Sequence, residues 1–341
     1  MLKLLFFGYY GEGNLGDDLL LKSLITVFGD KYNLGVLTNR SDRKQQQKGI
    51  REFYKFSTDV FKGVRWADVV VGGGGGIFQD KTSSRSFYYY IFVLFLSLLF
   101  GKKVYLLGQS FSPLESKINE VLLRVFLNRI EKIYVRDSFS KEYLVKLGVK
   151  PEKIVLSADL VFLLDFPFEL KNNSRAVGIS LREWRGFKFE EFNPILENLI
   201  QKYGEFYFFS FQDKDSQIYE LIENDFKSKI RLINPTDLEF LSYFSSCRLF
   251  IGMRLHSCIL SVLLGIPFIA ISYDEKVEAF CYEIDWKFVI KDFSQDKILC
   301  YVNEIEEDYQ YYRNYLLSKR ESLRKKIRED ILDFEREICR L

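Results

Sequence analysis

Histidine is nearly absent from this sequence, and cysteine is scarce. The 341 residues include one histidine, His256, and five cysteines, none of them in a C-x-x-C pair. An odd number of scattered cysteines argues against a disulfide framework and favours a reducing compartment. One histidine and dispersed carboxylates do not make a typical transition-metal site, so we expect no metal and no resident cofactor.

A surplus of charge and a secretory leader are also missing. Lysine and arginine number 49 and aspartate and glutamate number 47, which leaves a net charge of +2. This balance does not predict a nucleic-acid binder. Residues 1–7 run straight into a glycine-rich turn without a cleavage region, so we expect a cytoplasmic protein.

The longest apolar run is too short to cross a bilayer. Phe87–Phe100 reads F-Y-Y-Y-I-F-V-L-F-L-S-L-L-F and has 14 residues, whereas a spanning helix needs about 18–20. We expect a buried helix between strands. Docking of this segment onto a membrane surface is the alternative interpretation.

Short apolar runs alternate with helical segments along most of the chain, and 48% of the residues are hydrophobic. This pattern predicts α/β architecture with doubly wound parallel sheets. A polar break at Asp165–Arg175 separates two such series. We therefore predict a Rossmann-like domain at 1–168, a second at 175–296, and a helical segment at 297–341.

A glycine-rich turn, Gly8–Asp18, follows the first predicted strand and reads G-Y-Y-G-E-G-N-L-G-D-D. Asn14 and Asp17 in this turn either cap the following helix or bind a substrate hydroxyl. The turn contains a G-x-G-x-x-G pattern at residues 11–16. It comes late after the strand and lacks a suitably placed acidic residue, so we do not expect a dinucleotide site.

Five consecutive glycines, Gly72–Gly76, follow the predicted strand Ala67–Val71. Such a run loses much conformational entropy on folding, and a simple turn would need only one or two glycines. We expect the backbone of Gly73, Gly74 and Gly75 to face a ligand. A crowded crossing of chain segments is the alternative.

The richest stretch for chemistry is Ile251–Asp274, which begins I-G-M-R-L-H-S. Arg254 and His256 lie between the predicted strand Arg248–Ile251 and the predicted helix Ser257–Leu264. Ligands bind at the carboxyl ends of parallel strands, and helix N-termini favour anions. His256 is thus a candidate proton donor near neutral pH, and a purely structural histidine is the alternative.

Two further arginines, Arg182 and Arg136, also follow predicted strands. The guanidinium fork matches carboxylate and phosphate oxygens, so several arginines at strand ends indicate a small ligand with more than one negative charge. Arg136 has a second interpretation, because Asp137 follows it directly. It is either an anion ligand or an ion-pair partner of Asp137, which with Ser138 is a candidate helix cap.

Five short motifs in order resemble the polysaccharide pyruvyl transferase family over about residues 4–280. They are G-Y-Y-G-E-G-N-L-G-D-D, V-G-G-G-G-G-I-F-Q-D, G-Q-S-F-S-P, V-R-D-S-F-S, and M-R-L-H with I-S-Y-D-E-K-V downstream. Ser110 and Ser112 stand where the family's third motif has glycines. The resemblance implies two domains facing a cleft, as in glycosyltransferases of the B type.

The same resemblance implies phosphoenolpyruvate as a co-substrate and a sugar with two nearby hydroxyls as acceptor. Arg254, Leu255 and His256 would contact phosphoenolpyruvate, with His256 as general acid. Arg182 and Arg136 are the candidates for its other anionic groups. The N-terminal domain would hold the acceptor, which could be lipid-linked, and the protein could associate peripherally with the inner face of a membrane.

Two other functions fit the sequence. One is a glycosyltransferase that uses a nucleotide-sugar on the same architecture. The other is a non-catalytic partner in wall-polymer assembly, docking through Phe87–Phe100 or through the C-terminal segment Arg313–Leu341. The surplus of basic residues in this C-terminal segment is more typical of a solvated helix face.

Overall fold

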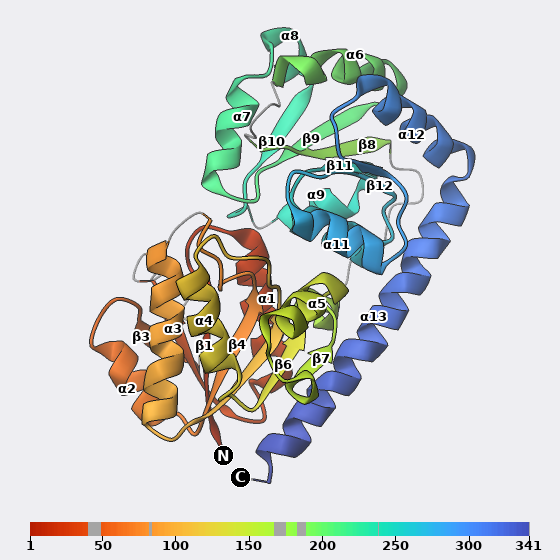
Figure 1. Cartoon of the computed structure of the whole chain (residues 1–341). Coiled ribbons are helices and arrows are strands. Elements are labelled where there is room, and N and C mark those ends of the chain that lie inside the picture. The colour runs from red at the N-terminus through yellow and green to blue at the C-terminus, as the bar shows by residue number, and fades with distance from the viewer. Residues whose placement is uncertain (40–48, 82–83, 167–174, 183–188, 238, 341) are drawn as a thin grey trace. The chain divides into compact units, whose positions relative to one another are not determined.

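The computed structural model describes residues 1–39, 49–81, 84–166, 175–182, 189–237 and 239–340 (Figure 1). The chain forms two compact units. The first comprises Met1–Glu12, Asp17–Asp165 and Leu323–Leu341, and the second comprises Gly13–Gly16 and Phe166–Ser322. Each unit contains one parallel sheet covered by helices, which confirms the predicted α/β class.

The sheet of the first unit has seven strands in the order β3-β2-β1-β4-β5-β6-β7, all parallel. The strand order reverses between β1 and β4, where ligand crevices form in doubly wound sheets. The strands are β1 (Lys3–Phe7), β2 (Asn33–Thr38), β3 (Arg51–Tyr54), β4 (Val69–Gly75), β5 (Lys103–Gln109), β6 (Lys132–Val135) and β7 (Ile154–Leu156).

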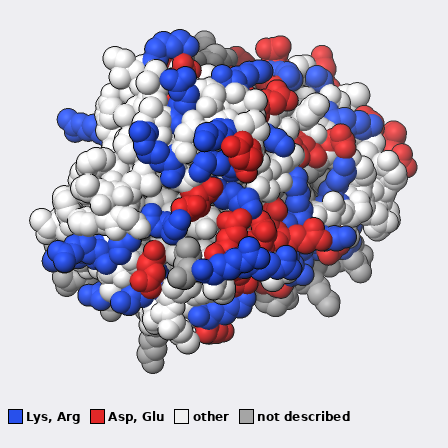
Figure 2. All heavy atoms as spheres, turned by 60° about the horizontal axis from the view of Figure 1, so that its bottom comes forward, with Lys and Arg blue, Asp and Glu red and all other residues white. Residues whose placement is uncertain are grey.

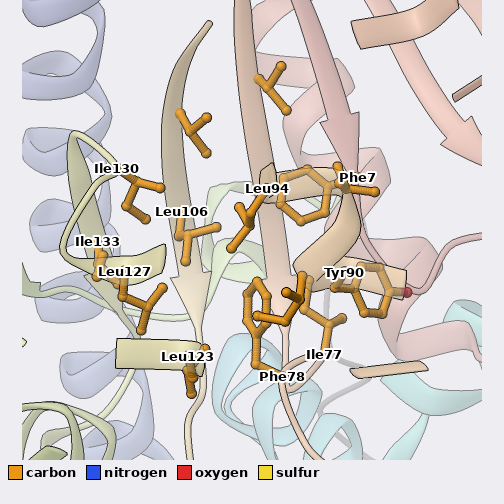
Figure 3. Close-up of a cluster of buried hydrophobic side chains, with 14 of the residues drawn as sticks. Phe7, Ile77, Phe78, Tyr90, Leu94, Leu106, Leu123, Leu127, Ile130 and Ile133 are labelled. Atoms are coloured by element: carbon orange, nitrogen blue, oxygen red, sulfur yellow. The ribbon is translucent and has the colours of Figure 1, made fainter. Parts of the chain in front are cut away.

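Helices α2 to α5 cover one face of this sheet and enclose a core of aliphatic and aromatic side chains, part of which Figure 3 shows. Helix α1 packs on the other face, where Phe6 meets Phe28. Neither β3 nor α2 was predicted from the sequence. The helices are α1 (Leu15–Phe28), α2 (Asp59–Trp66), α3 (Ser84–Leu99), α4 (Lys117–Leu127) and α5 (Ser138–Leu147).

Strand β4 continues through the glycine run to Gly75, so the predicted strand end at Val71 was wrong. The neighbours of this strand leave no room for side chains. A Cβ on Gly73 would lie 2.2 Å from Leu24 Cδ1 and 2.3 Å from the Tyr10 hydroxyl, which donates a 2.5 Å hydrogen bond to the Gly73 carbonyl. Packing inside the first unit is therefore sufficient to explain a glycine at position 73.

The sheet of the second unit has six parallel strands in the order β10-β9-β8-β11-β12-β13. Phe250 in β11 stacks on Phe244 at 4.5 Å in a core rich in phenylalanine. The strands are β8 (Ala176–Ser180), β9 (Glu205–Phe209), β10 (Ile230–Ile233), β11 (Cys247–Gly252), β12 (Phe268–Ile271) and β13 (Val289–Ile290). The helices are α6 (Asn193–Lys202), α7 (Ser216–Glu220), α8 (Asn224–Lys227), α9 (Phe240–Ser245), α10 (Leu255–Leu264), α11 (Glu275–Glu283) and α12 (Gln295–Glu307).

The last helix, α13 (Tyr309–Ile338), contributes its first half to the second unit and its second half to the first. In the first unit, Phe334 packs edge-on against Phe28 and Tyr105. The second half of α13 carries an apolar stripe whose residues are all buried. They are Leu323, Ile327, Ile331, Phe334 and Ile338.

No helix within the described residues is both long enough and apolar enough to span a bilayer. The apolar run forms α3, as predicted, but its burial is one-sided. Leu94 and Ile91 pack into the core, whereas Tyr88, Phe92 and Phe95 are exposed.

Gly73→Ala should destabilise the protein by about 1–3 kcal/mol, because the added methyl group overlaps packed atoms of Leu24 and Tyr10. Urea unfolding of the two proteins measures this difference. Gly204→Ala is the control, since a Cβ there has no atom within 4 Å. Equal stability of the Gly73 variant and the wild type would contradict the packing explanation.

A partly buried ion pair joins α12 to the sheet of the second unit. Arg248 donates from Nη2 to Glu306 Oε2 at 2.7 Å and from Nε at 3.0 Å, and Tyr203 donates to Oε1 at 2.7 Å. Burial raises the pKa of Glu306, but the hydrogen bonds from Arg248 and Tyr203 outweigh it and leave the pKa below its usual value.

We therefore expect this cluster to stabilise the fold above the unfolded-chain glutamate pKa of about 4.3. Because the folded-state pKa is lower, the stabilisation should disappear as the pH falls through that folded value. Glu306→Gln should lose roughly 1–2 kcal/mol at neutral pH and show a shallower acid dependence of stability. Urea unfolding at a series of pH values tests this, with the exposed Glu307→Gln as control; parallel acid profiles for the Glu306 variant and the wild type would refute it.

Candidate functional site at the carboxyl edge of the second sheet

Arg182 and Arg254 lie just beyond the carboxyl ends of two neighbouring strands, β8 and β11. In the register of β8 and β11, Ser180 pairs with Gly252, and the Met253 amide donates to the Ser180 carbonyl at 2.8 Å. Arg182 comes two residues after Ser180, and Arg254 comes two residues after Gly252. The two arginines therefore lie at adjacent positions on the carboxyl edge of the sheet, where parallel α/β sheets bind ligands.

The guanidinium of Arg254 is held by the carboxylate of Asp215. Its Nε donates to Asp215 Oδ2 at 3.0 Å and its Nη2 to Oδ1, and Nη2 also donates to Gln212 Oε1 at 3.2 Å. Asp215 is buried and accepts two more hydrogen bonds, from the amides of Phe211 and Gln212. This bidentate pair fixes the plane of the guanidinium.

His256 lies in the first turn of α10, one residue after Leu255, and both residues are half-buried. The imidazole packs directly on the backbone of Gly16. A Cβ on Gly16 would lie 2.0 Å from His256 Nδ1, so only glycine leaves space for the ring. Gly16, the last glycine of the first motif, thus leaves the space that the His256 ring occupies.

Gly13–Gly16 belongs to the second unit because its backbone binds the loop after β9. The Leu15 amide donates to the Phe211 carbonyl at 3.0 Å, and Asn14 forms an antiparallel bridge with Gln212. Asn14 Oδ1 accepts from the Gly16 amide at 3.1 Å, which is a helix cap at the start of α1. The capping role of Asn14 is confirmed, and its contact with a substrate hydroxyl stays a prediction.

Arg182 lies over the ring of Tyr273, with 4.4 Å between the guanidinium carbon and the ring centroid. Tyr273 follows β12, the strand on the other side of β11. Two buried polar atoms here, Arg182 Nε and Ser180 Oγ, have no hydrogen-bond partner among the described residues. Buried polar atoms are usually paired, so this edge has donors to offer a bound anion.

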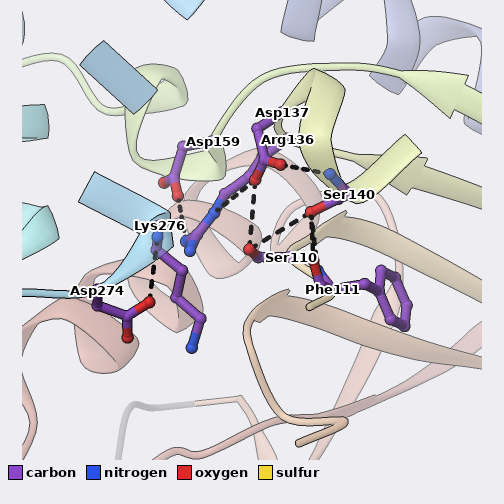
Figure 4. Close-up of polar contacts among 8 residues, drawn as sticks. All are labelled: Ser110, Phe111, Arg136, Asp137, Ser140, Asp159, Asp274 and Lys276. Carbon is purple, nitrogen blue, oxygen red and sulfur yellow. Dashed lines mark hydrogen bonds and ion pairs between the residues drawn. The ribbon is translucent and has the colours of Figure 1, made fainter. Parts of the chain in front are cut away.

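Arg136, in the first unit, forms two buried ion pairs (Figure 4). Its Nη1 lies 3.0 Å from Asp159 Oδ2 and its Nε lies 3.7 Å from Asp137 Oδ2. The pairing with Asp137 is the second of the two interpretations offered by the sequence. Contact of Arg136 with phosphoenolpyruvate stays a prediction, and it would require sharing a guanidinium that already serves two carboxylates.

The same network explains a serine of the third motif. Ser110 donates to Asp137 Oδ2 at 3.3 Å, and Asp137 caps α5 by accepting from the Ser140 amide at 2.7 Å. The Ser140 hydroxyl in turn accepts from the Phe111 amide at 2.8 Å. Ser110 thus anchors this loop to the start of α5, and the bond from the Ser140 amide confirms Asp137 as the helix cap.

Asp17 and the glycine strand lie together in the first unit. The Asp17 side chain is buried, and a Cβ on Gly75 would lie 2.9 Å from its Oδ1. Gly74 and Gly75 both have φ near +80°, which side chains rarely adopt. Whether Gly73, Gly74, Gly75 and Asp17 contact a sugar stays a prediction.

The polysaccharide pyruvyl transferase model matches residues 14–275, which include both arginines and the histidine of this edge. The chain belongs to this family. A curated relative, the amylovoran biosynthesis protein AmsJ of Erwinia amylovora, is 28% identical over 214 residues, 53% of this chain. The match spans about half of that relative, 51% of its length.

Solved structures with the same fold are more distant in sequence. Anabaena HepE, determined with UDP-glucose, superposes with a TM-score of 0.67 at 14% identity over 99% of this chain and all of that chain. The UDP-N-acetylglucosamine 2-epimerase of Rickettsia bellii gives 0.63 at 15% identity over 100% of this chain and 98% of its own. At these identities the likeness shows the fold alone.

The family motifs did not identify two residues that the structure brings to this edge. Asp215 belongs to none of the motifs, and nothing in the sequence paired it with Arg254. Gln212 bridges Asn14 and Arg254, but it follows β9 without a recognisable motif. Both lie in the loop after a strand, so the only available signal was their position at a carboxyl strand end.

A buried lysine in the first unit was also missed. Lys55 Nζ donates to the Tyr10 carbonyl at 3.2 Å and lies 3.4 Å from Glu12 Oε1. Burial lowers the pKa of Lys55, although Glu12 opposes the shift. Among the described residues, no group of three histidine, cysteine or carboxylate side chains could hold a metal ion.

Asp215→Asn should destabilise the second unit by roughly 3 kcal/mol, because it leaves the Arg254 guanidinium without its buried countercharge. Differential scanning calorimetry measures the loss. Asp213→Asn, an exposed carboxylate in the same loop, is the matched control and should be neutral. If both variants have the melting temperature of the wild type, the pair between Asp215 and Arg254 does not stabilise this edge.

Proposed function

We propose that this protein transfers the pyruvyl group of phosphoenolpyruvate onto two hydroxyls of a saccharide, forming a cyclic ketal and releasing phosphate. The proposal rests on the family and on the chemistry of the second unit's carboxyl edge. Its main support is that the register of β8 and β11 places Arg182 and Arg254 at adjacent strand ends. His256 lies in the first turn of the helix that follows, α10.

The donor carries a carboxylate and a phosphate on a three-carbon frame. Arg254 keeps its Nη1 edge for such a ligand, because the bonds to Asp215 and Gln212 use Nε and Nη2. Arg182 adds a second guanidinium, and Ser180 a hydroxyl. The amino end of α10 favours negative charge at the same place.

His256 acts as the general acid in this proposal. Protonated at its imidazole, it gives a proton to the methylene carbon of phosphoenolpyruvate, and positive charge develops on the central carbon. One sugar hydroxyl attacks that carbon, and the second then displaces phosphate and closes the ring. Of the two hydroxyl protons released, one replaces the proton that His256 delivered and the other leaves with phosphate.

We assign acceptor binding to the first unit, through Asp17 and the glycine strand. The curated relative is named for amylovoran biosynthesis, which supports an extracellular polysaccharide or its precursor as the acceptor class. A lipid-linked sugar is one form that such a precursor takes in this proposal. The reaction needs no metal, since the two arginines supply the positive charge that a phosphate leaving group requires.

The reaction can be tested by incubating the protein with phosphoenolpyruvate and candidate glycosides, followed by mass spectrometry. We expect the mass of the acceptor to rise by one pyruvate ketal. His256→Ala should lower turnover by about 100-fold or more, whereas phosphoenolpyruvate should still raise its melting temperature, because the arginines are intact.

Arg182→Ala is the complementary variant and should lose the thermal shift with phosphoenolpyruvate. A wild-type turnover in His256→Ala would remove the general-acid assignment. A thermal shift with nucleotide-sugars but none with phosphoenolpyruvate would refute the donor and favour a glycosyltransferase of the same fold.

A further inference from the structure

Helix α3 presents a second apolar face to solvent, opposite the one that packs on the sheet. Tyr88, Phe92, Phe95 and Leu99 recur at intervals of four, three and four, so they form one stripe along the helix. All of them are exposed. Nothing in the proposed reaction uses these side chains, and large exposed aromatic stripes usually mark an interaction surface.

The neighbouring helices extend this stripe into a surface. Helix α3 packs against both α2 and α4. Phe61 of α2 meets Phe92 edge-on, with 5.8 Å between ring centroids, and α4 contributes Ile118 and Val121. We call these exposed apolar residues of α2, α3 and α4 the aromatic face.

Basic residues outnumber acidic ones around the aromatic face. Residues 59–130, which contain all three helices, include nine lysines and arginines and five aspartates and glutamates, in a chain whose total charge is only +2. Arg65, Arg85 and Arg124 are exposed on these three helices. Lys62 and Lys117 are exposed there as well, but each pairs with a carboxylate of its own helix, Asp59 and Glu120. In Figure 2 the left side of the surface is largely white with blue side chains along its borders.

We propose that the aromatic face docks this protein onto an anionic lipid bilayer. Aromatic side chains favour the level of the lipid headgroups, and each lysine or arginine near an anionic surface adds electrostatic attraction. Insertion is shallow, because α3 has 16 residues and packs on the sheet along its inner side.

Charge selects the bilayer over a second copy of this chain. In a twofold dimer both subunits use the same patch, so pairing through the aromatic face would bring Arg65 and Arg85 close to the basic border of the second copy. An anionic membrane instead supplies the opposite charge along the whole border. The proposal does not rest on pyruvyl transfer, and its test contains no phosphoenolpyruvate.

The test is co-sedimentation of the full chain with vesicles. We expect binding to vesicles of equal parts phosphatidylcholine and phosphatidylglycerol, weaker binding to phosphatidylcholine alone, and release by high salt. Phe92→Gln with Phe95→Gln should weaken binding to both vesicles by about tenfold or more. Arg65→Gln with Arg85→Gln should weaken binding by about tenfold on the anionic vesicles only.

Leu99→Gln and Leu221→Gln form a matched pair, since these leucines are 63% and 58% exposed and Leu221 lies outside the aromatic face. Only Leu99→Gln should reduce vesicle binding, and both variants should melt like the wild type. The proposal is overturned if the wild type fails to bind anionic vesicles or if the stripe variants bind unchanged. Light scattering that shows a wild-type dimer and monomeric stripe variants, without vesicle binding, would assign the face to a second copy.

Discussion

The bidentate pair between Arg254 and Asp215 is the interaction on which the carboxyl edge of the second sheet depends. Asp215 is buried, and its carboxylate also accepts the amides of Phe211 and Gln212. One side chain therefore determines both the shape of the loop after β9 and the orientation of the arginine. A buried charge without its partner is costly, so neither member of the pair can change alone without disturbing the other.

The same loop binds the first glycine motif, which in turn packs against the M-R-L-H motif. Its backbone binds Gly13–Gly16, and Gly16 provides the space in which His256 lies. The first glycine motif and the M-R-L-H motif are about 240 residues apart in sequence but form one structure. A glycine at position 16 is thus required by the histidine, in addition to any contact that its backbone makes with a ligand.

Rigidity in the first unit comes from a different source. There the buried arginine, Arg136, is shared by Asp159 and Asp137, and the glycine strand β4 is packed against Tyr10 and Leu24. These groups hold each other in place without any ligand. The exposed side of α3 is the opposite case, because its aromatic residues have solvent where a partner would be.

Sequence patterns were sufficient to predict the fold class, most strands of the two sheets, and the position of Arg254 and His256 at a carboxyl strand end. They were sufficient because alternating apolar runs and glycine turns are local signals. They did not predict β3 and α2, because the sequence around them has no clear periodicity. The prediction ended β4 too early because glycine is rare inside strands.

Which distant charges pair, and which face of the apolar helix is buried, became known from the three-dimensional fold. Asp215 with Arg254, Asp159 with Arg136, and Glu12 with Lys55 are brought together from distant parts of the chain. No local pattern encodes such contacts, because they depend on the order in which strands join the sheet. In the same way, the apolar composition of α3 predicted a helix, but packing against the sheet alone determined that its second aromatic stripe stays exposed.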